Sequence, residues 1–96
     1  MKERPKELMS RRGLNGMPIV IFNDIIKEIV RAEELHGGMP SDLIHAAALV
    51  SEEVGELVKA VNDWHWHAKS ADKIRTEAIH VAATAIRFLI DLEKNK

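Results

Sequence analysis

Apolar residues recur every three or four positions through three long stretches of this 96-residue chain. The middle stretch is the clearest, because its apolar side chains keep helical spacing at positions 43, 46, 47, 50, 54, 57, 61 and 64. The same spacing runs through 19–30 and 74–92, and no stretch alternates apolar and polar residues as a half-buried strand does. The pattern therefore predicts an all-α fold.

Start and stop signals give the expected bounds of these helices. The first helix follows Pro18 and ends at the glycine pair of residues 37–38. Ser41 or Asp42 is the expected N-cap of the second helix, which runs to about Trp64. The third helix begins at Asp72 and continues to about residue 93.

The short segment 65–72 predicts that the second and third helices form an antiparallel hairpin. We expect this hairpin to pack with the helix of residues 19–36. Helices with wide apolar stripes need a further partner surface. A homodimer or higher homo-oligomer is therefore expected to complete a core like that of a four-helix bundle.

Charge and composition limit the partners of the chain. Residues 1–17 carry five Lys or Arg and two Glu, which predicts a basic arm, mobile or late to order, before a single all-α domain of residues 18–96. The formal net charge of −1 argues against a nucleic-acid partner. The chain has no cysteine, no apolar signal segment and no uncharged run near the ~18 residues of a membrane helix. These features predict a cytoplasmic protein with no membrane partner.

Acidic residues flank the apolar stripes of the hairpin helices. At 100° per residue, Glu53 lies roughly 70° from the centre of its stripe and Glu56 about 130°, on the same flank. Glu77 and His80 have nearly the same offsets on the last helix, roughly 80° and 140° on the matching side. The sequence midpoint between the two pairs lies inside the predicted turn, so the four side chains are expected to converge.

Three carboxylates and one imidazole in one place repel one another unless a cation neutralises them. A divalent metal site is the simplest arrangement that meets this requirement. The alternative is that Glu53 and Glu56 are solvated helix acids paired with Lys59 or Arg75, which is commoner on amphipathic helices.

The segment "EEVGELVKAV" (52–61), followed by "EAIHVAATAIRFL" (77–89), resembles the MazG-like, all-α nucleoside triphosphate pyrophosphohydrolases. That family is marked by Glu-x-x-Glu on one helix and Glu-x-x-Asp on a later one. The resemblance covers about residues 19–92. Glu53 to Glu56 matches the first motif, and Glu77 to His80 occupies the second, with histidine where the family has aspartate.

The resemblance implies a metal-dependent nucleotide pyrophosphohydrolase with Glu53, Glu56, Glu77 and His80 as ligands of Mg²⁺ or Mn²⁺. The ion would polarise the phosphate chain of a nucleotide while water attacks and releases pyrophosphate. Imidazole suits Mn²⁺ better than Mg²⁺, which prefers hard oxygen ligands, so we expect Mn²⁺ to serve at least as well. Loss of activity through His80 is the alternative.

The resemblance also suggests roles around the metal. Glu52 would hold a second ion or orient water as a catalytic group, and Lys59 would meet phosphate oxygens. His45 and Leu49 would line the substrate pocket, and Trp66 would stack on a nucleobase. A solvated Lys59, a structural His45 and a Trp66 that closes a helix pair or a subunit interface are the alternatives.

Two other functions remain open from the sequence. Glu77-Ala78-Ile79-His80 is a Glu-x-x-His pair, and a dimer would supply two such pairs, as in carboxylate-bridged di-iron bundles. An acid-edged hairpin that dimerises is also consistent with a non-catalytic regulatory module that has lost the site.

Overall fold

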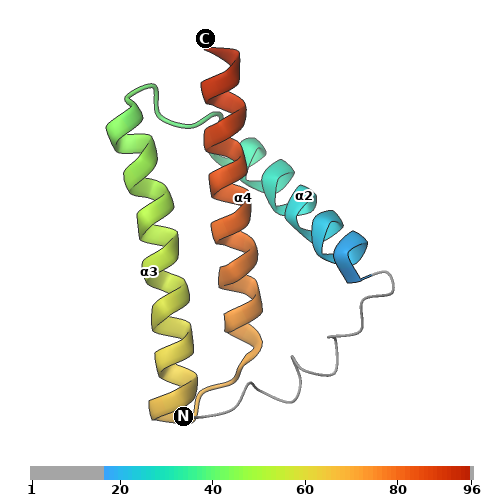
Figure 1. The fold of residues 1–96 in the computed structure, drawn as a ribbon, viewed down its shortest axis with the longest axis vertical. Coiled ribbons are helices and arrows are strands. Elements are labelled where there is room, and N and C mark those ends of the chain that lie inside the picture. The colour runs from blue at the N-terminus through green and yellow to red at the C-terminus, as the bar shows by residue number, and fades with distance from the viewer. Residues whose placement is uncertain (1–16, 96) are drawn as a thin grey trace.

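The computed structural model describes residues 17–95, which form three α-helices: α2 (Met17–His36), α3 (Leu43–His67) and α4 (Asp72–Lys94) (Figure 1). The all-helical prediction is confirmed. The predicted basic arm of residues 1–17 lies outside the described part of the chain, except for Met17, with which α2 begins. None of the described helices is both long and apolar enough to cross a membrane.

Local signals fix the helix ends as the sequence predicts, with one exception. Asp42 is the N-cap of α3, where its side chain accepts a hydrogen bond from the Ile44 amide at 2.9 Å. Gly37, with φ of 71°, follows α2 in the left-handed region that glycine adopts without strain. The exception is the end of α3, which continues past Trp64 to His67 and stops at Ala68, whose φ is 54°.

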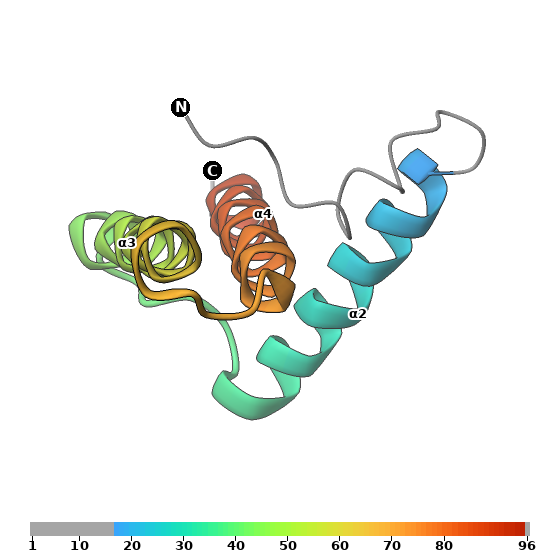
Figure 2. The same ribbon diagram turned by 90° about the horizontal axis from the view of Figure 1, so that it is seen from below.

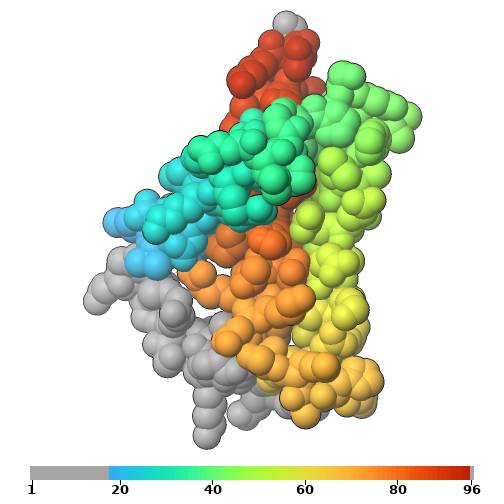
Figure 3. Space-filling view, turned by 180° about the vertical axis from the view of Figure 1, so that it is seen from behind, coloured from blue at the N-terminus to red at the C-terminus, as the bar shows by residue number. Residues whose placement is uncertain are grey.

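Helix α4 is the central element, because it packs against both α3 and α2 (Figure 2). Helices α3 and α4 run antiparallel, which confirms the predicted hairpin, and α2 crosses α4 obliquely (Figures 1 and 3). The connection of residues 68–71 rises from the end of α3 to the start of α4. The last turn of α3 therefore extends beyond the first turn of α4.

The interior between the helices is made mostly of small side chains. The buried apolar residues among those described are one isoleucine and five alanines: Ile25, Ala32, Ala46, Ala60, Ala71 and Ala83. No large side chain of the described residues is fully buried. Small residues allow close helix contact, but they remove little apolar area from water.

The apolar stripe expected on the first helix does not face α4. Helix α2 packs through Ile25 and Ala32, and Ile19, Phe22, Ile26 and Val30 are half to two-thirds exposed. On α3 the large apolar side chains left exposed include Leu43, Val54, Val58 and Val61, which lie within an arc of about 60°. We call these two sets the outer apolar faces of α2 and α3.

Polar contacts tie α2 and the α2–α3 connection to α4. The buried guanidinium of Arg87 donates from Nε to Glu33 Oε2 at 2.9 Å and from Nη2 to the Gly37 carbonyl at 3.2 Å. The Asp91 carboxylate accepts from the Met39 amide at 2.7 Å. Since these contacts hold the C-terminal end of α2, they also position that helix beside the acids of the hairpin.

Candidate metal and nucleotide site

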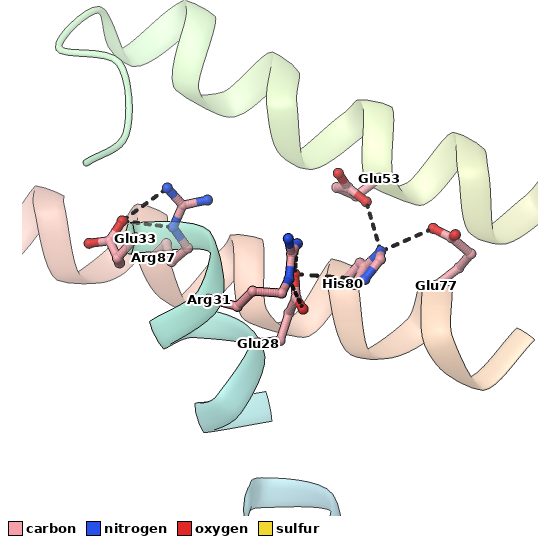
Figure 4. Close-up of polar contacts among 7 residues, drawn as sticks. All are labelled: Glu28, Arg31, Glu33, Glu53, Glu77, His80 and Arg87. Carbon is pink, nitrogen blue, oxygen red and sulfur yellow. Dashed lines mark hydrogen bonds and ion pairs between the residues drawn. The ribbon is translucent and has the colours of Figure 1, made fainter. Parts of the chain in front are cut away.

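His80 lies at the centre of a group of carboxylates from all three helices (Figure 4). Its Nδ1 atom is 3.5 Å from Glu77 Oε2 on α4 and 3.9 Å from Glu53 Oε2 on α3. Its Nε2 atom is 3.7 Å from Glu28 Oε2 on α2. The hairpin therefore brings together three of the four side chains that the sequence predicted to converge, Glu53, Glu77 and His80, and the fourth, Glu56, does not join them.

Each of these groups has a local reason for its position. Glu77 and His80 are three residues apart on α4, so their side chains emerge on one face. Glu53 lies beside the packed face of α3, and its side chain is only a third exposed. The side chains of Glu77 and His80 are 12% and 30% exposed, so the group is largely withdrawn from water without being sealed.

The donor atoms fit a divalent metal ion. One atom each from Glu53, Glu77 and His80 can be chosen so that all lie within 4.8 Å of one another. An ion held at about 2.1 Å places neighbouring donors about 3 Å apart and opposite donors about 4 Å apart. The distances of 3.5 and 3.9 Å lie within that range.

Charge also favours a cation at this point. Within residues 17–95, neither Glu53 nor Glu77 forms an ion pair with a lysine or an arginine. Two positively charged side chains of the hairpin are engaged elsewhere, since Lys59 pairs with Asp63 at 2.9 Å and Arg75 with Asp24 at 2.7 Å. Arg31, whose guanidinium is bonded to Glu28, attracts Glu53 at longer range. The two carboxylates thus face His80 without a direct ion pair to a described Lys or Arg.

Glu28 is a member of this group that the sequence patterns did not identify. Arg31, three residues later, donates to its two carboxylate oxygens at 2.8 and 2.6 Å. These bonds hold the pKa of Glu28 below its usual value, although partial burial acts in the opposite direction. In the sequence, Glu28 appears only as part of a Glu-x-x-Arg pair on α2. Such pairs are common on exposed helices and do not indicate a functional site.

A cavity of about 550 Å³ adjoins the group. It lies between the C-terminal half of α2, the α2–α3 connection and the facing sides of α3 and α4. Leu49, Met39 and Pro40 give it apolar walls, and Arg31 and His36 give it donors for anionic groups. Its size lies within the range of about 300–1,000 Å³ that is typical of small-molecule sites.

Other predicted site residues lie outside the three-residue group and do not line this cavity. Glu56 is exposed on α3, and Glu52 and His45 are exposed on the same helix. Lys59 is held by Asp63, so its predicted contact with phosphate requires this surface pair to open. The pairing raises the pKa of Lys59 and lowers that of Asp63.

Trp66 is part of α3 and not of the turn. Its side chain is 71% exposed, and its ring meets the His65 ring edge-on, with centroids 4.3 Å apart. The sequence predicted the helix end at about Trp64, where the apolar stripe stops, three residues before the observed end at His67. Trp66 lies near the C-terminal end of α3, whereas Leu49, which lines the cavity, lies near the N-terminal end of the same helix.

Comparisons with protein-family profiles, with characterised proteins and with solved structures gave no match.

Proposed function

We propose that the protein is a metal-dependent nucleotide pyrophosphohydrolase, which converts a nucleoside triphosphate and water to the monophosphate and pyrophosphate. The observation that carries the proposal is the pair of carboxylates, Glu53 and Glu77, that face His80 Nδ1 without a direct ion pair to a described Lys or Arg. The MazG-like motifs add the class of substrate. Such an activity fits a cytoplasmic protein, where nucleotides and divalent ions are present.

The residues of the chain have distinct roles in this proposal. Glu53, Glu77 and His80 hold Mn²⁺ or Mg²⁺, and the cavity beside them receives the nucleotide. Arg31 and His36 donate to phosphate oxygens, since both line the cavity and Arg31 has donors beyond those used by Glu28. A divalent ion in this position supplies positive charge to a phosphoryl oxygen and acidifies a bound water.

The direct test is release of pyrophosphate from a panel of nucleoside triphosphates with Mn²⁺ or Mg²⁺. We expect Mn²⁺ to support turnover at least as well as Mg²⁺, because His80 replaces a hard carboxylate. His80→Asp should raise Mg²⁺-dependent turnover roughly tenfold, the change that ~1.4 kcal/mol of better binding produces. If neither protein releases pyrophosphate with either ion, the proposal is wrong. Iron in the purified protein together with oxygen consumption would favour the di-iron alternative.

A second candidate function is a dimeric interaction or regulatory module, and the outer apolar faces of α2 and α3 favour it. Monomeric proteins seldom leave contiguous apolar patches above about 600 Å² exposed. These faces run along two helices whose buried residues are mostly alanine. A homodimer or higher homo-oligomer that covers them is compatible with either function.

We expect the protein to sediment as a dimer or larger species at micromolar concentration. Ile26→Glu on α2 or Val58→Glu on α3 should shift it toward monomer, since each places a charge on an outer apolar face. Lys69→Glu is the control, because Lys69 is exposed in the α3–α4 connection. A wild-type monomer at this concentration would contradict the proposed assembly.

A further inference from the structure

Glu28 and the two hairpin acids lie on different sides of the His80 ring. Glu53 and Glu77 approach Nδ1, at 3.9 and 3.5 Å, whereas Glu28 approaches Nε2, at 3.7 Å. Glu28 also falls outside the set of donors that lie within 4.8 Å of one another. The three carboxylates are therefore not equivalent, and Glu28 is separated from the other two by the imidazole (Figure 4).

We propose that Glu28 is a positioning residue for the metal site: when an ion binds, the 3.7 Å contact between Glu28 Oε2 and His80 Nε2 shortens to a hydrogen bond, in which Glu28 accepts the Nε2 proton and so commits Nδ1 to the ion. This inference rests on the proposed metal site, and it adds a residue from α2 that the family motifs do not contain. An imidazole that donates one N–H to a carboxylate has its ring orientation and tautomer fixed, and its other nitrogen becomes a better ligand.

Arg31 holds Glu28 in place, so that Glu28 positions His80 and does not itself bind the metal. Its guanidinium donates to both Glu28 oxygens, so the carboxylate is held in one orientation on α2. The Glu28 side chain is 15% exposed and that of Arg31 is 55% exposed. The carboxylate is thus directed inward to α4, unlike the acid of an ordinary surface ion pair.

The oblique packing of α2 on α4 (Figure 1) places Glu28 beside His80. Glu28 lies four residues before Ala32, which is buried, and five before Glu33, which pairs with Arg87 of α4. The contacts of Arg87 with Glu33 and the Gly37 carbonyl, which we call the Arg87 clamp, therefore help to hold Glu28 beside the His80 ring. Without α2, the hairpin would still hold its three donors, but the ring of His80 would be free to turn.

The test compares Glu28→Ala and Glu28→Gln with Glu34→Ala, which removes the same charge from an exposed site on α2. We expect Glu28→Ala to weaken Mn²⁺ binding, measured by electron paramagnetic resonance, by about 10–100-fold, the usual loss for an outer-shell partner. Glu28→Gln should lose less, because its amide oxygen still accepts a hydrogen bond. Circular dichroism checks that each variant keeps its helix content.

A second readout follows the ring itself in the intact protein. With Zn²⁺ as a diamagnetic probe, two-bond ¹H–¹⁵N correlation spectra of His80 should show a metal-bound Nδ1 and a protonated Nε2 in the wild type. Glu28→Ala should show a mixture of the two binding modes, and Glu34→Ala should match the wild type. If Glu28 only stabilised the fold, Glu28→Ala would not change which nitrogen of His80 binds the metal.

The outcomes separate this inference from the proposed function. Wild-type protein that binds metal through Nε2 overturns the inference and leaves the metal site intact. Equal Mn²⁺ affinity in Glu28→Ala and Glu34→Ala would also overturn the inference and leave the metal site intact. If the wild type binds neither Mn²⁺ nor Zn²⁺, the metal site itself is wrong, and the inference falls with it.

Discussion

Glu53→Gln is expected to abolish both metal binding and pyrophosphate release, with a loss of at least ~100-fold in each. The amide has the shape of the carboxylate but not its charge, and it leaves Glu77 and His80 as the remaining described donors of the group. The loss should therefore appear with Mn²⁺ and with Mg²⁺. Titration with Mn²⁺ and a pyrophosphate assay at saturating nucleotide measure the two effects.

The matched control is Glu34→Gln, an exposed acid on α2 that should leave both quantities unchanged. Glu56→Gln is a further comparison, because the MazG-like motif and the observed geometry differ there. Glu56 is exposed and outside the three-residue group, so we expect a smaller loss than for Glu53→Gln. Full binding and turnover by Glu53→Gln would contradict the site as a whole.

Arg87→Met is expected to cause a large loss of stability. It removes a buried guanidinium and leaves Glu33 and the Gly37 carbonyl without their donor. Removing one partner of a fully buried pair costs ~3–5 kcal/mol, and since the Glu33 side chain is 34% exposed we expect about 2 kcal/mol. For a chain of this size that corresponds to a drop in Tm of roughly 10 °C.

Thermal and urea denaturation at one fixed protein concentration measure this effect, because assembly also contributes to stability. Lys27→Met on the exposed side of α2 is the control and should change the free energy of unfolding by less than about 0.5 kcal/mol. Combining Arg87→Met with Glu33→Leu should recover part of the loss, because no unpaired charge then remains. Equal stability of Arg87→Met and Lys27→Met would show that the clamp does not hold α2.

Much of the fold could be predicted because helix formation is a local matter. Spacing, the Asp42 cap and the glycine after His36 gave the helices and the hairpin, and offsets of 100° per residue brought Glu53, Glu77 and His80 together. Glu56 stayed outside although its offset is about the same as that of His80, because α2 packs mainly against α4 and so covers His80 but leaves Glu56 exposed. The sequence gives the angle between each acid and the apolar stripe of its own helix, but it does not give how the three helices pack together.

The arrangement of α2 could not be predicted in the same way. Helix α2 has two apolar sides, one with Ile25 and Ala32 and the other with Phe22 and Ile26, and periodicity favoured the second. Tertiary contacts selected the first, since small residues admit α4 and the Arg87 clamp adds polar contacts on that side. The contact of Glu28 with His80 depends on this crossing and leaves no pattern in the sequence.

The division of the site between the hairpin and α2 has a consequence for the order of events in folding and ligand exchange. Glu53, Glu77 and His80 are joined by a short connection, so closing the hairpin costs less entropy than docking the distant Glu28. A chain with a formed hairpin and a detached α2 already holds the three donors. Local opening of α2, which is tied to α4 by a few side chains, exposes them while the hairpin stays folded. In the proposed metal site, the rates at which an ion enters and leaves would then be set by α2, and they would respond to the Arg87 clamp without any change in the donors themselves.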